Sequence, residues 1–225
     1  MIIELKTLDQ IDPCQLAYHA NEQSIGNYLR NSFPYPYTLD HAMSFITHSL
    51  ENHGLDFGIV VDGICVGCIG GTLHNDIDVH NCELGYWLNP AYANKGIMKQ
   101  AVKLFCLYVF ENYHIHKIYA EVFVENLASC HVLEANQFVK EGYLYEHAYK
   151  NFQYHDIIIY SLRRDFKQFK GMQTENDIRD VVIYARASTR NQKDDLKNQV
   201  EFLKQFCNSQ GIIVNQCIED YSYLK

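Results

Sequence analysis

The sequence predicts an α/β (α+β) fold followed by a short second unit, and three observations support this prediction. The chain has 225 residues, of which 48 % are hydrophobic, 20 % are charged and 4 are prolines, so it can build an ordinary buried core and is not globally disordered. Short stretches of alternating apolar residues are interspersed with longer stretches of helical periodicity. From Arg163 to Asp180 this pattern dissolves into polar residues before a new apolar stretch begins.

The N-terminal part should contain one strand and two helices. Residues 2–8 alternate as a strand does, and helices are expected over residues 12–31 and 38–52, the second preceded by the capping residue Thr38. Two prolines in the segment between the helices impose extended backbone and interrupt the helix. The aromatic residues of this segment either line a substrate entrance or only pack the two helices together; they are Phe33, Tyr35 and Tyr37.

Three consecutive strands should follow as an antiparallel meander, over residues 55–61, 64–72 and 81–88, because Asp62-Gly63 is a strong hairpin dipeptide. A turn-rich segment then leads into a helix over residues 97–113. The start of such a helix leaves backbone N–H groups unpaired, so it can hold a pyrophosphate without a basic side chain. The apolar face predicted for this helix consists of Ile97, Ala101, Leu104, Phe105 and Tyr108.

The remaining elements of the first unit are a strand over residues 117–124, a helix over 126–136 and two closing strands over 139–149 and 152–162. After a polar stretch, the second unit should be a single βαβ unit, with strands over 181–185 and 212–218 and a helix over 194–209. Such a unit cannot bury both faces of its strands alone. We therefore expect it to dock on the first unit, self-associate or remain partly disordered.

Composition limits the classes of function. The formal net charge is −8, and residues 1–176 carry 12 Lys and Arg against 20 Asp and Glu, which argues against nucleic-acid binding. An acidic body could favour amine substrates, although a solvated acidic surface is the commoner explanation. The longest apolar runs are too short to cross a bilayer, and the first residues lack a signal pattern. We therefore expect a cytoplasmic protein without a membrane partner.

The 8 cysteines do not form the even framework of a small secreted protein, so reduced and mostly buried thiols are expected. Cys65 and Cys68 have the spacing of a zinc pair, but no second cysteine pair accompanies them. His114 and His116 fall between a helix and a strand, where a loop role is favoured. No metal site is therefore predicted.

Four motifs stand in order beside expected strands and helices: Glu83-Leu-Gly-Tyr-Trp-Leu88, Asn94-Lys-Gly-Ile-Met98, Asn126-Leu-Ala-Ser129 and Tyr154-His-Asp156. Together they resemble the fourth strand, the pyrophosphate loop, the Asn-x-x-Ser helix and the closing strand of the GNAT superfamily of acetyl-CoA-dependent N-acetyltransferases, most closely its RimJ/RimL-like branch. The resemblance covers residues 1–166. It implies the GNAT fold, a mixed, largely antiparallel central sheet with flanking helices.

The resemblance also implies direct transfer of the acetyl group of acetyl-CoA to an amine. A lysine amine, with a pKa of about 10.4, must first lose a proton, and Glu83 is the candidate base; its alternative role is that of a salt-bridge partner at a strand edge. Ser129 is the candidate proton donor near the sulfur atom, or else an ordinary helix-face residue. Asn126 would bind the pantetheine arm or an ordered water, or cap its own helix.

Further contacts with acetyl-CoA follow from the same resemblance. Backbone N–H groups near Tyr86, Trp87 and Leu88 would polarise the thioester carbonyl as an oxyanion hole does. The residues of the pyrophosphate loop would bind the cofactor, mainly through backbone amides; they are Asn94, Lys95, Gly96, Ile97 and Met98. The acceptor would be a protein N-terminus or a small amine, and the enzyme a monomer or a homodimer.

The sequence departs from the family pattern at a few positions. Ala93 stands where family loops often carry Arg or Gln, and Met98 where they often carry Gly or Ala. Leu133 replaces the tyrosine that is the general acid in other branches, so any acid must lie elsewhere. Gln137 replaces a usual glycine after the Asn-x-x-Ser helix, so this helix end should be less favourable.

The tail contains the motif Tyr184-Ala-Arg-Ala-Ser188 at the end of an expected strand. This motif resembles the start of a serine recombinase catalytic domain of the resolvase type, which would make Ser188 the nucleophile that attacks DNA, with Arg186 near the scissile phosphate. The arginine-bearing segment that this family places further on is missing from the sequence. After a linker over residues 167–179, we therefore expect residues 180–225 to be an inactive fragment without useful DNA binding. A recombinase-related fusion protein and an inactive remnant are the alternatives to an acetyltransferase.

Overall fold

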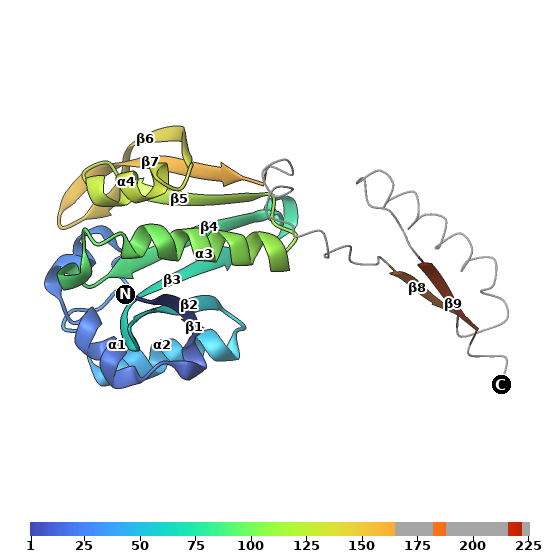
Figure 1. Cartoon of the computed structure of the whole chain (residues 1–225). Coiled ribbons are helices and arrows are strands. Elements are labelled where there is room, and N and C mark those ends of the chain that lie inside the picture. Colours follow the sequence, from blue (N-terminus) through green and yellow to red (C-terminus); the bar gives the residue numbers. More distant parts are fainter. Residues whose placement is uncertain (165–181, 188–215, 222–225) are drawn as a thin grey trace. The chain divides into compact units, whose positions relative to one another are not determined.

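The computed structural model describes residues 1–164, 182–187 and 216–221. The chain divides into two compact units, and the first of them is Met1–Arg164 (Figure 1). In the second unit, β8 (Val182–Ala187) and β9 (Gln216–Tyr221) pair in parallel. The helix expected over residues 194–209, Ser188 and the linker over residues 167–179 lie outside the described residues.

The first unit is built on a mixed sheet of seven strands, in the order β1-β2-β3-β4-β5-β7-β6. Its neighbouring strands are antiparallel except for β4 and β5, which are parallel. The predicted mixed and largely antiparallel sheet is therefore confirmed. The strands are β1 (Ile3–Thr7), β2 (Leu55–Val61), β3 (Ile64–Leu73), β4 (Asn81–Leu88), β5 (Lys117–Phe123), β6 (Val139–Lys150) and β7 (Gln153–Arg163).

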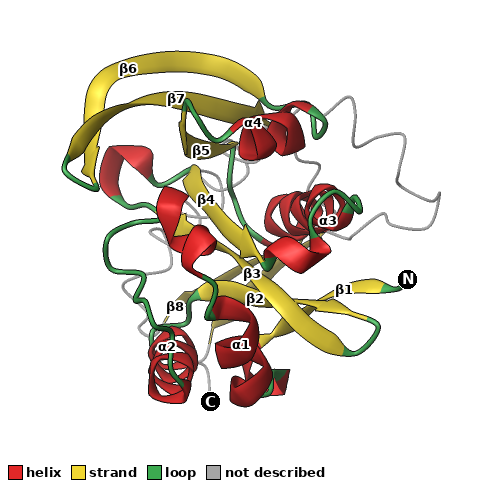
Figure 2. Ribbon diagram, turned by 90° about the vertical axis from the view of Figure 1, so that its left-hand side faces the viewer, coloured by secondary structure: helices red, strands yellow, loops and turns green. Residues whose placement is uncertain are grey.

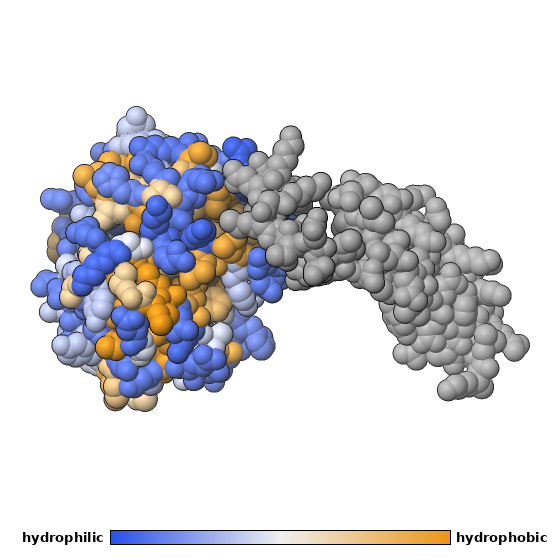
Figure 3. All heavy atoms as spheres, in the orientation of Figure 1, coloured by the Kyte–Doolittle hydropathy of each residue, from blue (hydrophilic) through white to orange (hydrophobic). Residues whose placement is uncertain are grey.

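Four helices flank this sheet: α1 (Pro13–Ala20), α2 (Leu39–Glu51), α3 (Ile97–Asn112) and α4 (Leu127–Glu134). Figure 2 shows α1 and α2 on one side of the sheet and α3 and α4 on the other. Side chains at the helix starts fix where helices begin: Asp12 accepts the N–H of Cys14, and Thr38 accepts the N–H of His41. None of the helices in the described ranges is long and apolar enough to cross a membrane. On the face drawn in Figure 3, hydrophilic residues surround patches of hydrophobic ones.

Two expectations about helices need correction. The helix expected over residues 12–31 ends at Ala20, and a 3-10 helix follows over Gln23–Tyr28. Asn21, which lies between these two helices, is a weak helix former. Its side-chain oxygen accepts the backbone N–H of Tyr37, a residue outside the expected helix. In α3, Tyr108 is 39 % exposed and Leu104 is half-buried, whereas the buried face is wider than expected and also includes Met98, Val102, Cys106, Val109 and Phe110.

The feature that positions the candidate site is the short contact between β4 and β5. These two strands pair only from Asn81 opposite Lys117 to Glu83 opposite Tyr119. Along the rest of its length, up to Leu88, β4 pairs with β3 alone. The strands therefore diverge after Glu83, and the edge of β4 that faces β5 is left without a ladder partner in the middle of the sheet.

Candidate functional site

Two cavities meet at the diverging part of β4. The first, of about 480 Å³, lies at the start of α3 and is called the α3 cavity; the second, of about 510 Å³, lies beside α2 and is called the α2 cavity. Both are lined by Leu29, Gly85, Tyr86 and Trp87. Because successive side chains of a strand point to opposite faces, Tyr86 faces the α3 side and Gly85 and Glu83 the α2 side.

The loop before α3 presents backbone N–H groups to the α3 cavity. Asn94 and Gly96 both have left-handed backbone, with φ values of 59° and 74°, and Gly96 begins the helix without a capping side chain. The first turn of α3 contains no acidic residue, and Ile97, Met98 and Lys99 line the cavity with it. This helix start has the unpaired N–H groups and the partial positive charge that bind anionic groups.

Lys95 is the residue of the predicted pyrophosphate loop whose side chain points elsewhere. Its Nζ atom donates to the backbone oxygen of Ala91 at 2.9 Å and lies 5.2 Å from the centre of the Tyr92 ring. Lys95 does not line the α3 cavity, whereas Asn94 and Gly96 do. Any contact of Lys95 with a ligand there would come from its backbone.

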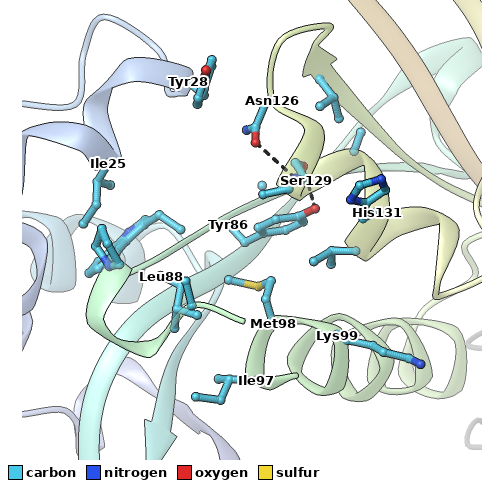
Figure 4. Close-up of a pocket in the computed structure, with 18 of the residues that line it drawn as sticks. Ile25, Tyr28, Tyr86, Leu88, Ile97, Met98, Lys99, Asn126, Ser129 and His131 are labelled. Carbon is cyan, nitrogen blue, oxygen red and sulfur yellow. Dashed lines mark hydrogen bonds between the residues drawn. The ribbon is translucent and has the colours of Figure 1, made fainter. Parts of the chain in front are cut away.

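Opposite the start of α3, Tyr86 is joined to α4 by a hydrogen bond across the gap between β4 and β5. The hydroxyl of Tyr86 lies 2.8 Å from Oγ of Ser129, and the side chain of Asn126 accepts the backbone N–H of Ser129 at 3.1 Å (Figure 4). Asn126 is therefore the cap of α4, one of its two expected roles. Burial raises the pKa of the Tyr86 hydroxyl, which is therefore protonated at neutral pH.

The Tyr86 hydroxyl is a candidate site group that the sequence alone did not single out. The residue was expected to act through its backbone, and no motif indicated that its side chain would reach Ser129. The alternation along β4 gives one signal, because Tyr86 shares the face of the buried Leu84. Only the fold shows that α4 lies across that face.

Glu83, the candidate base, forms an ion pair with a residue of the α1–α2 connection. Nη2 of Arg30 lies 2.6 Å from Oε1 of Glu83 and 3.9 Å from Oε2 of Glu121. The hydrogen bond to Glu83 raises the pKa of the Arg30 guanidinium. The structure thus contains the salt bridge that was the alternative for Glu83, and the same side chain, 23 % exposed, also lines the α2 cavity.

The aromatic segment before α2 contributes two of its three expected residues to the α2 cavity. Phe33 and Tyr37 line it, with ring centres 5.1 Å apart, and Phe33 lies 6.1 Å from the ring of Trp87. Both also pack on the core near α1 and α2, which is the packing role expected for this segment. Burial raises the pKa of Tyr37 to about 12. Tyr35 is 57 % exposed and is not among the lining residues.

The thiols and histidines of the described residues form no cluster of three or more ligands that could hold a metal. Cys65 and Cys68 are buried free thiols of β3. The Sγ atom of Cys65 donates to the backbone oxygen of Gly67.

Two families match the chain. The family model described as an acetyltransferase (GNAT) domain matches residues 3–139, and the model described as the resolvase N-terminal domain matches residues 181–223. The first match contains the loop before α3, Tyr86, Glu83 and α4. The second covers the tail, where the sequence resembles a serine recombinase.

Individual relatives agree with the first match. The chain is 32 % identical over 111 residues to a putative ribosomal N-acetyltransferase, YdaF, of Bacillus subtilis, a stretch that is 49 % of this chain and 60 % of that protein. It is 35 % identical over 77 residues to a spermidine N(1)-acetyltransferase of Vibrio cholerae, covering 34 % of this chain and 44 % of that protein. The chain thus spans about half the length of these curated relatives.

The solved structure of Mycobacterium smegmatis RimJ in complex with a CoA disulfide has the same fold. It matches with a TM-score of 0.65 and 19 % identity, over 72 % of this chain and 81 % of that one.

Proposed function

Because the chain belongs to the acetyltransferase (GNAT) domain family, we propose that it transfers the acetyl group of acetyl-CoA to an amine by direct attack. The observation that carries this proposal is the meeting of two cavities at β4, where β4 parts from β5. The α3 cavity ends at an uncapped helix start that suits a pyrophosphate. The α2 cavity approaches the same point of β4 from the other side and would admit the acceptor.

Acetyl-CoA would bind in the α3 cavity. The backbone amides from Asn94 to Met98 would hold its pyrophosphate, since no acidic side chain competes with them in the first turn of α3. Near Tyr86, Trp87 and Leu88, the edge of β4 that faces β5 is not paired with it. Backbone groups on this edge would hold the thioester end of acetyl-CoA. Asn126 already accepts a backbone N–H with its oxygen, so its side-chain NH₂ group is the part that would face the pantetheine arm.

The proposed transfer needs one proton removed and one returned. The deprotonated amine attacks the thioester carbonyl, an oxyanion forms, and the C–S bond breaks to release CoA as a thiolate that takes a proton. We assign proton removal to Glu83, directly or through a water, because its carboxylate lines the α2 cavity beside Arg30. We assign proton donation to the pair of hydroxyls of Tyr86 and Ser129.

The acceptor would be a protein N-terminal α-amine or a small amine. Of the two curated relatives, one is named a putative ribosomal N-acetyltransferase and the other a spermidine N(1)-acetyltransferase. Both classes would need the amine to reach β4 through the α2 cavity, whose aromatic wall includes Phe33 and Tyr37.

We assign the transferase to residues 1–166, a linker to residues 167–179 and no catalytic part to residues 180–225. The resolvase match covers the last of these ranges. The tail carries as many acidic as basic residues, 7 of each over residues 177–225, which gives it no general attraction for DNA.

A calorimetric titration of the full chain with acetyl-CoA tests the proposal. We expect micromolar binding, and we expect Lys99→Glu to weaken it at least tenfold, because Lys99 lines the α3 cavity in the first turn of the helix. Lys103→Glu is the matched control, since it makes the same charge reversal one turn further along α3, outside the cavity lining. Absence of acetyl-CoA binding by the folded chain would favour an inactive remnant instead.

A further inference from the structure

A row of three residues crosses the sheet on the floor of the α2 cavity. Asp56 of β2 lies opposite Gly70 of β3, and Gly70 lies opposite Gly85 of β4. All three line the α2 cavity. Residues in register on neighbouring strands project from the same face of the sheet, so the row consists of one carboxylate beside two positions without side chains.

The two glycines keep this row open in different ways. A Cβ atom at Gly70 would collide with Oδ1 of Asp56, which shows that the carboxylate lies directly over Gly70. A Cβ atom at Gly85 would meet nothing within 4 Å. The carboxylate therefore borders empty space that extends over Gly85 to the diverging edge of β4.

Within residues 1–164, the carboxylate of Asp56 is held by a hydrogen bond at one of its oxygens, Oδ2. The hydroxyl of Ser49, a buried residue of α2, donates to Oδ2 at 2.7 Å. Within residues 1–164 no lysine or arginine nitrogen lies within 4 Å of Asp56, whereas Glu83 in the same cavity is paired with Arg30. Burial raises the pKa of Asp56, because removal from water disfavours the charged carboxylate. A cation bound beside the carboxylate would offset this desolvation cost.

The walls of the α2 cavity suit an aliphatic chain. They include five aromatic residues: Phe33, Tyr37, Phe45, Tyr86 and Trp87. Methylene groups can lie against aromatic rings while a terminal ammonium reaches a polar partner. The space thus has an apolar wall, a flat glycine floor and an anionic end.

We propose that the α2 cavity selects acceptors that carry a second cationic group, as diamines and polyamines do, and that Asp56 accepts a hydrogen bond from the ammonium that does not react. This inference rests on the proposed function, because it places the reacting amine at the edge of β4. Strands are spaced by about 4.8 Å, so the distance from the carboxylate over β3 to the far edge of β4 is roughly 5–10 Å. A short linear diamine has this length.

The test compares two acceptors that differ by one amine, cadaverine and n-pentylamine, in acetylation by the full chain with acetyl-CoA. We expect kcat/KM to be at least tenfold higher for cadaverine than for n-pentylamine. The Asp56→Asn variant should reduce this preference for cadaverine at least tenfold, mainly by raising KM for cadaverine. Asp9→Asn is the matched control, since Asp9 is exposed and lines neither cavity. Equal kcat/KM values for the two amines, or an unchanged ratio in Asp56→Asn, would overturn the inference.

A binding measurement separates this inference from the proposed function. Calorimetry of the full chain with cadaverine in the presence of CoA should show binding that Asp56→Asn weakens at least tenfold. If cadaverine binds in this way but no amine is acetylated, the proposed function fails and the cation site stands. If pentylamine or an alanine-initiated peptide is acetylated as well as cadaverine, the function stands and the selectivity of Asp56 is refuted. If cadaverine binding is absent or indifferent to Asp56→Asn, the site is refuted directly.

Discussion

Tyr86 has the strongest geometry for a proton donor among the residues of the candidate site. Its hydroxyl lies in the α3 cavity, 2.8 Å from Oγ of Ser129, and burial keeps it protonated. A hydroxyl with a raised pKa does not ionise in the neutral or mildly alkaline range, so it can deliver a proton to a departing thiolate throughout that range.

We predict that Tyr86→Phe lowers kcat by about 10²-fold or more, the usual contribution of a positioned general acid. The loss should be the same from neutral to mildly alkaline pH, because the raised pKa keeps the wild-type hydroxyl protonated there. Release of the CoA thiol at saturating acetyl-CoA measures kcat. Ser129→Ala, which removes the neighbouring hydroxyl, is the comparison, and a smaller loss is expected for it. Full turnover in Tyr86→Phe would assign the proton to another group.

The sequence indicated candidate site residues but not the residues that they contact. Glu83, Asn126 and Ser129 were recognised by motif, and all three lie around the two cavities. Arg30 was not recognised, because it is 53 residues from Glu83 and belongs to a connection without a motif. Asp56 was missed for a similar reason: it is one polar residue in an apolar strand, and only the cross-strand register places it beside two glycines.

Secondary-structure elements were predicted well where local chemistry decides them. The hairpin at Asp62-Gly63 is confirmed, with Gly63 at a φ of 88°, and α2 begins after its capping residue Thr38. The helix expected over residues 12–31 was wrong because a tertiary contact, from Tyr37 to the side chain of Asn21, replaced its continuation. The divergence of β4 and β5 has no local signal, since it depends on the pairing of strands far apart in the sequence.

The end of α4 has a strained backbone conformation at Gln137, where the sequence indicated a less favourable helix end. Gln137, at the position where the family usually has glycine, has left-handed backbone with a φ of 66°. The chain nevertheless closes the helix there, since the N–H of Phe138 donates to the oxygen of Leu133 at 3.1 Å. A residue with a Cβ atom in this conformation is strained.

We predict that Gln137→Gly stabilises the protein by up to about 1 kcal/mol, because relief of the left-handed strain exceeds the entropy cost of glycine. Urea unfolding of the full chain measures the change. Asn136→Gly is the matched control one residue earlier; it should destabilise, because Asn136 has no positive φ and its side chain donates to the oxygen of Val132 at 2.9 Å. A loss of stability in Gln137→Gly would show that the Gln137 side chain has a compensating role.

At the scale of the whole molecule, the chain joins two unequal parts. The acetyltransferase family model matches residues 3–139 and the resolvase model residues 181–223. The first unit, Met1–Arg164, contains the complete seven-stranded sheet and both cavities. The predicted linker over residues 167–179 rests on the loss of periodicity from Arg163 onward, because a polar stretch without alternation cannot continue a sheet.

Contacts of Arg164 at the end of β7 define where the chain can be shortened. The backbone N–H of Arg164 donates to the oxygen of His116 at 2.8 Å, and its guanidinium donates to the backbone oxygen of Phe110. These contacts tie the end of β7 to α3 and to the turn between α3 and β5. A chain that ends at Gln168 keeps all of them.

We predict that a chain ending at Gln168 binds acetyl-CoA within twofold of the affinity of the full chain and unfolds at the same temperature, because the sheet and the α3 cavity are contained in residues 1–164. Calorimetry and thermal unfolding measure the two quantities. A chain ending at Asp156 is the control: it removes the residues of β7 that pair with β5 from Lys117 to Phe123, so it should not fold. A folded chain ending at Gln168 with tenfold weaker binding would instead give the resolvase-like tail a part in cofactor binding.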